Sequence, residues 1–171
     1  MSVLVLLEQR GELKNSALEA ATAANKIAKA AGMELNAVFI GKSLESEADK
    51  LKGFGISKVF AYQNEKLTHY SSDGYVPIVR DLTTERGAKL ISASASALGK
   101  EFCASVAAPL GVELVQDCIG LEWDNGLVAK KPVYAGKIVS DVRVKSDPAF
   151  VSLRPNVSPV EPEGDAAPEV V

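Results

Sequence analysis

The amino-acid sequence predicts an α/β fold: a mostly parallel sheet covered by helices on both faces, in three layers. Two observations lead to this prediction. Five short segments are almost continuously apolar, as strands are when helices cover both faces of a sheet, at residues 3–7, 34–40, 57–62, 88–93 and 112–118. Segments of helical character separate these runs, and right-handed β-α-β crossovers join such alternating elements into a parallel sheet.

Glycines mark the ends of the predicted helices. Gly32, Gly55, Gly87 and Gly111 each stand just before one of the apolar runs. A glycine just past the last helical residue supplies the left-handed conformation that lets the chain turn back. The spacing therefore predicts four helices, each of which leads directly into a strand.

The first of these helices begins with a predicted capping box from Ser16 to Glu19, followed by a face of small residues that suits close packing on a sheet. Pro77 is tolerable only near the first turn of the third helix, and Pro109 only in or beyond the last turn of the fourth. The other three helices are expected from Ser43, over residues 73–86 and over residues 99–110.

The helical period disappears after Cys118, and Asp124-Asn125-Gly126 is a hairpin signal. Trp123 and Tyr134, together with Tyr62, lie in predicted strands, where packing in a core or an interface is the usual role of aromatic side chains. We expect largely antiparallel C-terminal strands that extend one edge of the sheet, at residues 119–124, 127–134, 137–145 and 149–153.

The predicted α/β/α domain covers residues 1–153, and residues 154–171 are expected to form a linker or disordered tail. That last segment holds four prolines and four carboxylates in 18 residues. Such a composition buries too little apolar surface to offset an ordering cost of roughly 1–2 kcal/mol per residue.

Composition excludes several classes of function. The chain has 171 residues, 47% of them hydrophobic, and a formal net charge of −3, as expected of one globular domain. Its basic residues form no stripe that would neutralise a phosphate backbone, so we expect no nucleic-acid partner. The first apolar run ends at Leu7, too short for a signal peptide or a membrane span. Cys103 and Cys118 form no CxxC pair, so both are expected to be buried thiols of a cytoplasmic protein.

A search for catalytic or metal-binding groups finds none that converge. His69 is the single histidine and lies in a polar loop without a nucleophile motif beside it. Glu45, Glu47 and Asp49 are spaced around a predicted helix and form no cluster. The sequence therefore predicts neither catalytic residues nor a metal site.

Phosphate-binding motifs are also incomplete. Gly99-Lys100 resembles the end of a Walker A loop, but Glu101 occupies the Ser/Thr position of that motif and Ser94 its upstream glycine. Glu8 stands at the tip of the first strand, where ATP pyrophosphatases have a phosphate loop and where an acidic side chain repels phosphate.

The turn after the fourth strand allows two interpretations. Ser92, Ser94, Ser96 and the N–H groups around Gly99 could hold an anion or the backbone of a partner at a helix N-terminus. Alternatively, Ser96 is simply the N-cap of the helix. With Glu8, these residues are the candidates for a vestigial nucleotide pocket or a partner contact.

Five segments, taken in order, resemble the alpha subunit of electron transfer flavoproteins. The resemblance covers this chain to about Asn156, and this part corresponds to the N-terminal domain of that subunit. They are VLVLLEQ, SALEAATAA, LISASASALGKEFCASVAAPLGVELVQD, PVYAGK and VSLRPN.

The resemblance implies a Rossmann-like α/β/α domain of the adenine nucleotide alpha hydrolase type that pairs with a similarly folded beta subunit. It further implies that FAD is held mainly by a C-terminal domain of the alpha subunit, and that AMP is bound by the beta subunit. The assembly takes electrons from flavin dehydrogenases and passes them to a membrane-bound quinone reductase. This domain would then be a scaffold and not an enzyme.

Two features depart from the family pattern. The FAD-binding C-terminal domain is absent from these residues, and the family's Pro-Arg in the fourth helix is Ala104-Ser105 here. The alternative interpretation is an adenine-nucleotide-binding regulatory module of the universal stress or nucleotide alpha hydrolase type. A weaker third one, an enzyme that uses Glu8 and the serine turn, lacks a convergent acid/base pair.

Overall fold

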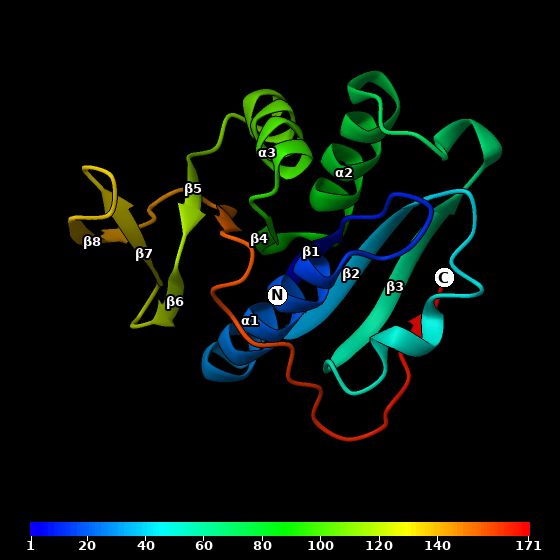
Figure 1. Cartoon of the computed structure of the whole chain (residues 1–171), viewed down its shortest axis with the longest axis horizontal. Helices are drawn as coiled ribbons and strands as arrows, with labels where there is room; N and C mark the ends of the chain where they lie inside the picture. The colour runs from blue at the N-terminus through cyan, green and yellow to red at the C-terminus, as the bar shows by residue number, and fades with distance from the viewer.

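A seven-stranded sheet forms the centre of the molecule, and every neighbouring pair of its strands is parallel (Figure 1). The computed structural model describes all residues from 1 to 171. In spatial order the strands are β10 (Glu169–Val170), β3 (Ile56–Gln63), β2 (Glu34–Gly41), β1 (Ser2–Leu7), β4 (Ala88–Ser94), β9 (Ala149–Leu153) and β5 (Leu114–Cys118).

Helices cover both faces of this sheet, which confirms the predicted α/β class and fits a Rossmann-like fold. On one face Val3, Val5 and Leu7 pack with helix α1 (Asn15–Ala31). On the other face Leu4 and Leu6 belong to the cluster of α2 (Ser72–Arg86) and α3 (Ala97–Leu110). The alternation along β1 thus divides the core into two layers, as in a strand covered on both sides.

The helix ends follow the glycine signals at three of the four positions. Gly32, Gly87 and Gly111 cap α1, α2 and α3 with φ angles of 64°, 56° and 66°. Pro109 lies in the last turn of α3, as expected. Pro77 is the sixth residue of α2, just past its first turn.

The prediction of a helix from Ser43 is wrong. Only a 3-10 turn, η1 (Ala48–Leu51), forms there, and contacts with distant segments hold the residues before it. The Leu44 N–H donates to the Gln63 side chain at 2.8 Å. The buried Glu47 carboxylate accepts from the Leu13 N–H at 2.9 Å and from Lys50 Nζ at 2.8 Å.

The prediction of a capping box at Ser16 is also wrong. Helix α1 begins at Asn15, and Lys14 occupies the N-cap position without a side-chain cap. Glu19 is buried and does not reach back to the backbone of the N-cap residue, because its carboxylate accepts from the Asn156 N–H at 2.7 Å and from the Asn15 side chain at 3.2 Å.

The C-terminal strands do not extend the sheet edge as predicted. Residues 149–153 form β9, which runs parallel to its neighbours and lies between β4 and β5. All five residues of β9 are buried, so its continuous apolar pattern matches a strand covered on both faces. The antiparallel strands before it form a separate sheet of their own.

That separate sheet is a three-stranded arm at one side of the molecule, with β8 as an outer strand (Figure 1). The Asp124-Asn125-Gly126 hairpin is confirmed, since Trp123 pairs with Leu127 across it. The arm supplies the long connection that two parallel neighbours, β5 and β9, require. Its strands are β6 (Gly120–Trp123), β7 (Leu127–Val133) and β8 (Ile138–Arg143).

Residues 154–171, expected to be a linker or disordered tail, follow a defined path across α1 and end as the edge strand β10 beside β3 (Figure 1). Val160 packs against the core on the α1 side, which adds apolar burial that the composition did not suggest. Hydrogen bonds and ion pairs join the segment to the rest of the chain: Glu161 N–H to Thr22, Glu163 N–H to the Gly53 carbonyl, Gly53 N–H to the Ala166 carbonyl, Val171 N–H to the Val59 carbonyl, Lys26 to Glu161 and Lys58 to Glu169. The domain boundary at residue 153 stays a prediction.

Two further expectations concern buried and exposed groups. Cys103 and Cys118 are free and buried, as predicted. Trp123 and Tyr62 pack against the two core clusters, but Tyr134 lies outside any strand and is 77% exposed. None of the helices is long and apolar enough to cross a membrane.

Candidate functional site

The carboxyl ends of the parallel strands meet at one edge of the sheet, the position at which α/β proteins bind ligands and partners. Glu8 follows β1, Ser94 ends β4, Asp117 lies near the end of β5, and Arg154 follows β9. Four of the five candidate residues, Glu8, Ser94, Ser96 and Gly99, gather here, whereas Ser92 does not.

A short chain of hydrogen bonds fills the N-terminus of α3. The Ser96 hydroxyl donates to Glu8 Oε2 at 2.6 Å, and its oxygen accepts from the Gly99 N–H at 2.9 Å. Ser96 is therefore the N-cap of α3, as one of the two interpretations proposed. Glu8 brings a carboxylate to the positive end of the helix, which stabilises both.

Gly99 is required for close packing at this point. A Cβ atom on residue 99 would lie 2.0 Å from the backbone oxygen of Ser94, so the first turn of α3 could not approach the end of β4. Ser94 is 2% exposed, and its hydroxyl accepts from the Ser96 N–H at 3.3 Å. Both residues thus serve the turn itself.

Ser92 lies away from this group. It is fully buried within β4, between Val5 and Val151 of the neighbouring strands, and its hydroxyl has no hydrogen-bond partner. It is a small residue of the core and does not reach the edge.

These hydrogen bonds decide whether the N-terminus of α3 can bind a phosphate. A helix N-terminus attracts phosphate when its N–H groups are free, but here Ser96 occupies the Gly99 N–H and the carboxylate of Glu8 stands behind Ser96. Arg10 is the nearest cation to Glu8 and only reaches 4.0 Å from it. The α3 N-terminus therefore does not fit a nucleotide phosphate, because a second negative group would meet Glu8 at short range.

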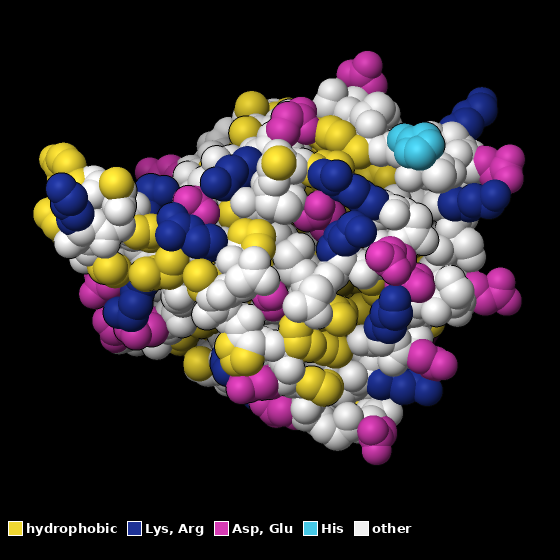
Figure 2. All heavy atoms as spheres, viewed as in Figure 1, with side chains coloured by type: hydrophobic (Ala, Val, Ile, Leu, Met, Phe, Trp, Pro, Cys, Tyr) yellow, Lys and Arg dark blue, Asp and Glu magenta, His cyan; other side chains and the backbone are white.

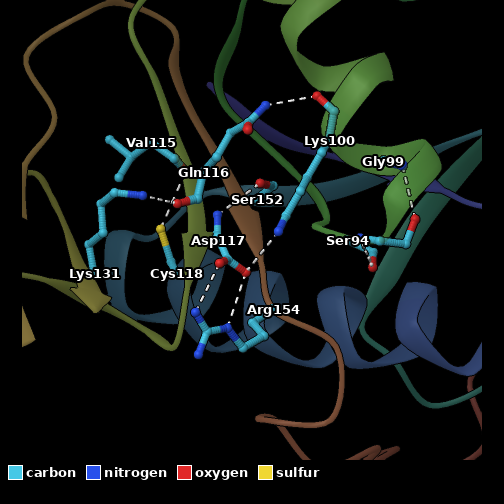
Figure 3. Close-up of polar contacts among 11 residues, drawn as sticks. Ser94, Gly99, Lys100, Val115, Gln116, Asp117, Cys118, Lys131, Ser152 and Arg154 are labelled. Atoms are coloured by element: carbon cyan, nitrogen blue, oxygen red, sulfur yellow. Dashed lines mark hydrogen bonds and ion pairs between the residues drawn. The ribbon is translucent and has the colours of Figure 1, made fainter. Parts of the chain in front are cut away.

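A second polar cluster connects β5, β9 and α3 at the same edge (Figure 3). The Arg154 guanidinium donates to both carboxylate oxygens of Asp117, at 3.1 and 2.9 Å, and Lys100 Nζ lies 3.6 Å away. These cations hold the pKa of Asp117 below its usual range, the hydrogen bonds from Arg154 having the largest effect. Asp117 also has a φ of 64°, a conformation that Asp tolerates better than most residues.

A hollow of about 440 Å³ lies beside the Glu8 site. It is lined by Gln9, Arg10, Gly11, Thr68, His69, Tyr70 and Leu98. The Gln9 side chain is already committed, because it donates to the Ile40 carbonyl at 3.0 Å and accepts from the Gly11 N–H at 2.8 Å. His69 is at the rim of this hollow, on the face shown in Figure 2, without an acid or a nucleophile bonded to it.

The two thiols are not reactive groups. Burial raises the pKa of Cys103 to about 12 and that of Cys118 to about 11. At neutral pH both are protonated, so neither offers a thiolate for redox or nucleophilic chemistry. No group of three or more His, Cys, Asp or Glu side chains could hold a metal ion.

The Asp117–Arg154 pair was not predicted from the sequence. The signal was present, since each residue stands at or just after the end of an apolar strand. Only a parallel β9 brings both strand ends to the same edge, whereas the antiparallel arrangement that we expected would have separated them.

Comparison with known proteins gives consistent matches along the whole chain. A family model described as the electron transfer flavoprotein domain matches residues 3–171. The electron transfer flavoprotein subunit alpha of Clostridium acetobutylicum is 35% identical over 170 residues, which cover 96% of this chain and 50% of that protein. The subunit of the same name from Bacillus subtilis is 33% identical over 157 residues, covering 90% and 47%.

Protein FixB of Clostridium saccharobutylicum is also similar, at 32% identity over 160 residues that cover 91% of this chain and 48% of that protein. The chain thus spans about half the length of the curated relatives it matches.

Proposed function

The chain belongs to the electron transfer flavoprotein domain family, and from this premise we propose that it is the N-terminal, alpha-type domain of a two-subunit flavin electron carrier. In this role the domain performs no bond chemistry and holds a beta-type subunit in place. FAD is held mainly outside residues 1–171, by a C-terminal domain of the alpha subunit and by the beta subunit that closes over the flavin. The assembly works in the cytoplasm, between flavin dehydrogenases and a membrane-bound quinone reductase.

The observation that carries this proposal is the Glu8–Ser96–Gly99 chain. A nucleotide-binding module needs free N–H groups or cations at the carboxyl edge of the sheet, and here the Ser96 hydroxyl takes the Gly99 N–H while the Glu8 carboxylate stands behind it. The edge is therefore built to stabilise the fold, which suits a scaffold. In this proposal AMP belongs to the partner subunit.

The competing interpretation, an adenine-nucleotide-binding regulatory module, would have to use the hollow beside Glu8. That hollow offers Arg10 and His69, but its remaining polar groups include a Gln9 side chain already bonded within the protein. A module of this type predicts stoichiometric binding of AMP by the chain alone.

Calorimetry with the purified chain separates the two. We expect binding of the beta-type electron transfer flavoprotein subunit of the same organism, and no binding of AMP or FAD by the chain alone at micromolar concentration. Tight AMP binding would instead support the module, and micromolar FAD binding would move the cofactor site into these residues.

A pair of variants tests the role of Glu8 directly. Glu8→Gln keeps the shape of the side chain and removes its charge, so any residual affinity for AMP should increase by about tenfold if the carboxylate repels phosphate. Glu12→Gln is the matched control, because Glu12 lies in the same loop with a side chain 63% exposed and paired only with Lys14. Equal AMP affinities in both variants would contradict the proposed exclusion.

A further inference from the structure

A polar hollow of about 230 Å³ lies at the edge where the strands begin, opposite the edge at which α/β proteins usually bind ligands. Residues at the starts of β1, β2 and β3 line it, together with Arg86, the last residue of α2. In the sheet register Asn36 of β2 lies between Leu4 of β1 and Lys58 of β3. Its side chain is on the face that α2 covers, because Ile40, four residues further along β2, packs on that face. The hollow therefore lies between the sheet and the C-terminal end of α2.

Asn36 presents an unpaired hydrogen-bond acceptor at this hollow. The residue is 7% exposed, and its Oδ1 atom is buried without a partner. Burying a polar atom costs free energy unless a hydrogen bond replaces the one lost to water, so such atoms normally have a partner. A leucine would fill nearly the same space without this cost. Oδ1 needs an N–H or O–H donor, which a ligand in the hollow can supply.

Two unpaired side-chain charges of opposite sign line the same hollow. The Arg86 guanidinium forms no ion pair and lies over the ring of Phe60, with its central carbon 4.6 Å from the ring centroid. This cation–π contact holds the guanidinium in place. Glu34, at the start of β2, is exposed and also forms no ion pair. Lys58 is already paired, with Glu169 at 3.3 Å. The hollow thus offers one free cationic and one free anionic side chain.

We propose that this hollow binds a small α-amino acid in its zwitterionic form. The α-carboxylate pairs with Arg86, because a planar guanidinium matches a carboxylate with two parallel hydrogen bonds. The α-ammonium donates to Asn36 Oδ1 and lies beside the Glu34 carboxylate. A plain anion would leave Oδ1 without a donor and would be repelled by Glu34, whereas a plain cation would be repelled by Arg86. A ligand with both charges close together satisfies all three side chains.

The volume of the hollow fits an amino acid with a small side chain. Pockets for drug-sized ligands hold about 300–1,000 Å³, so about 230 Å³ suits a molecule of the size of alanine or serine. The site lies at the other edge of the sheet from Glu8 and Ser96. Binding there leaves their hydrogen bond in place and needs no beta-type subunit, so it is independent of the proposed function.

NMR titration of the purified, isotope-labelled chain with L-alanine tests this site. We expect saturable shifts of the Asn36 side-chain amide and of the Arg86 Nε–H signal, with a Kd of about 1 mM. Three related compounds serve as comparisons: propionate lacks the ammonium group, ethylamine lacks the carboxylate, and L-lactate has a hydroxyl in place of the ammonium. Each should bind at least about tenfold more weakly than L-alanine.

Two variants test the side chains that contact the ligand. Asn36→Leu keeps the shape of the side chain and removes the unpaired oxygen. It should weaken alanine binding at least about tenfold, while the urea midpoint of unfolding stays at or above the wild-type value. Arg86→Gln should weaken binding to the same extent. Arg80→Gln is the matched control and should have no effect, because Arg80 lies on the exposed face of the same helix and pairs with Asp81.

Glu34→Gln distinguishes a zwitterion from a plain anion. The change should weaken alanine binding and strengthen propionate binding, each by about threefold, because the same carboxylate attracts an ammonium group and repels a second carboxylate. Glu45→Gln is the matched control, since Glu45 is exposed, forms no ion pair and lies beyond the opposite end of β2. It should change neither affinity.

Three results would overturn the proposal. If L-alanine gives no saturable shift up to about 20 mM, the hollow holds water and not an amino acid. If propionate or L-lactate binds as tightly as L-alanine, the site does not select a zwitterion. If Asn36→Leu lowers the urea midpoint and leaves alanine binding unchanged, the amide serves the fold and not a ligand.

Discussion

At the carboxyl edge of the sheet the candidate polar groups meet partners from the chain itself, whereas the far end of the antiparallel arm leaves the cation of Lys137 and the apolar side chains of Tyr134, Ile138 and Val139 exposed. Ser96 connects Glu8 to α3, and Arg154 closes on Asp117. By contrast, Tyr134 and Lys137 at the arm end lie in a run of exposed residues.

The difference teaches where to look for function in this fold. The carboxyl edge of the sheet is the usual ligand site of α/β proteins, but here its polar groups form hydrogen bonds and ion pairs within the chain. The arm occupies the place of a crossover helix and carries no ligand-binding motif, and the side chains at its far end are exposed. If this contrast is right, substitutions at the edge should cost stability, and those at the arm end should cost little or stabilise.

The largest effect is expected for Gly99→Ala. The added methyl group would lie 2.0 Å from the Ser94 carbonyl oxygen, a backbone atom that cannot rotate away. The first turn of α3 must then move, at a cost of about 3 kcal/mol in the free energy of unfolding. Urea denaturation followed by circular dichroism measures this quantity.

Gly120→Ala in the arm is the matched control. Its Cβ atom would meet the nearest atom, Lys130 Cδ, at 3.4 Å, an ordinary contact. We expect a change within about 0.5 kcal/mol. Comparable losses in both variants would remove the distinction between a tightly packed edge and a tolerant arm.

Ser96→Ala should have the next largest effect. It removes the cap of the Gly99 N–H and leaves the buried side of the Glu8 carboxylate without its donor, so the free energy of unfolding should fall by about 2 kcal/mol. Ser105→Ala is the control, because Ser105 also donates to a glutamate, Glu101, at 3.0 Å, but on the exposed face of α3. Its effect should be below about 0.5 kcal/mol.

The sequence predicted the layers and most strands because both depend on local patterns. Buried strands such as β1 are continuous apolar runs, and a glycine with positive φ comes directly after the last residue of α1, of α2 and of α3. The N-cap role of Ser96 could be predicted for the same reason, since it depends on three consecutive peptide units.

What failed depends on contacts between distant segments. In place of the helix expected from Ser43, Glu47 accepts from the Leu13 N–H and Gln63 accepts from the Leu44 N–H. In place of the capping box, the Glu19 carboxylate accepts from the Asn156 N–H. The insertion of β9 between β4 and β5 is a choice of topology that no local period encodes. Glu8 could be named as a candidate from the sequence. Its hydrogen bond with Ser96, 88 residues away, could not be predicted before the fold was known.

The Asp117–Arg154 pair predicts a dependence of stability on pH. Because Arg154 lowers the pKa of Asp117 in the folded state, the ionised carboxylate stabilises the fold above the ordinary Asp pKa of about 3.9. This contribution is lost as the pH falls through the lower pKa of the folded protein. Asp117→Asn keeps a residue that tolerates φ near 64° and should lower stability at pH 7 by less than about 1 kcal/mol, since the pair is partly exposed.

Denaturation curves at pH 7, 5, 4 and 3 check the sign of this effect. The difference between wild type and Asp117→Asn should be constant from pH 7 to 5 and should shrink below about pH 4. A difference that stays constant down to pH 3 would show that the variant acts through packing and not through the charge on Asp117.

The smallest effect, and the one with the opposite sign, is expected at the arm end. Ala135 has a φ of 56°, which costs a non-glycine residue roughly 1–2 kcal/mol, and glycine removes that strain. Glycine also gives the unfolded chain more freedom, at a cost of about 0.4–1 kcal/mol, so Ala135→Gly should stabilise the fold by about 0.5 kcal/mol net. Ala104→Gly, on the exposed side of α3, should instead destabilise it by about 1 kcal/mol. A loss of stability at position 135 would mean that the turn is not strained and that the contrast with the edge is weaker than proposed.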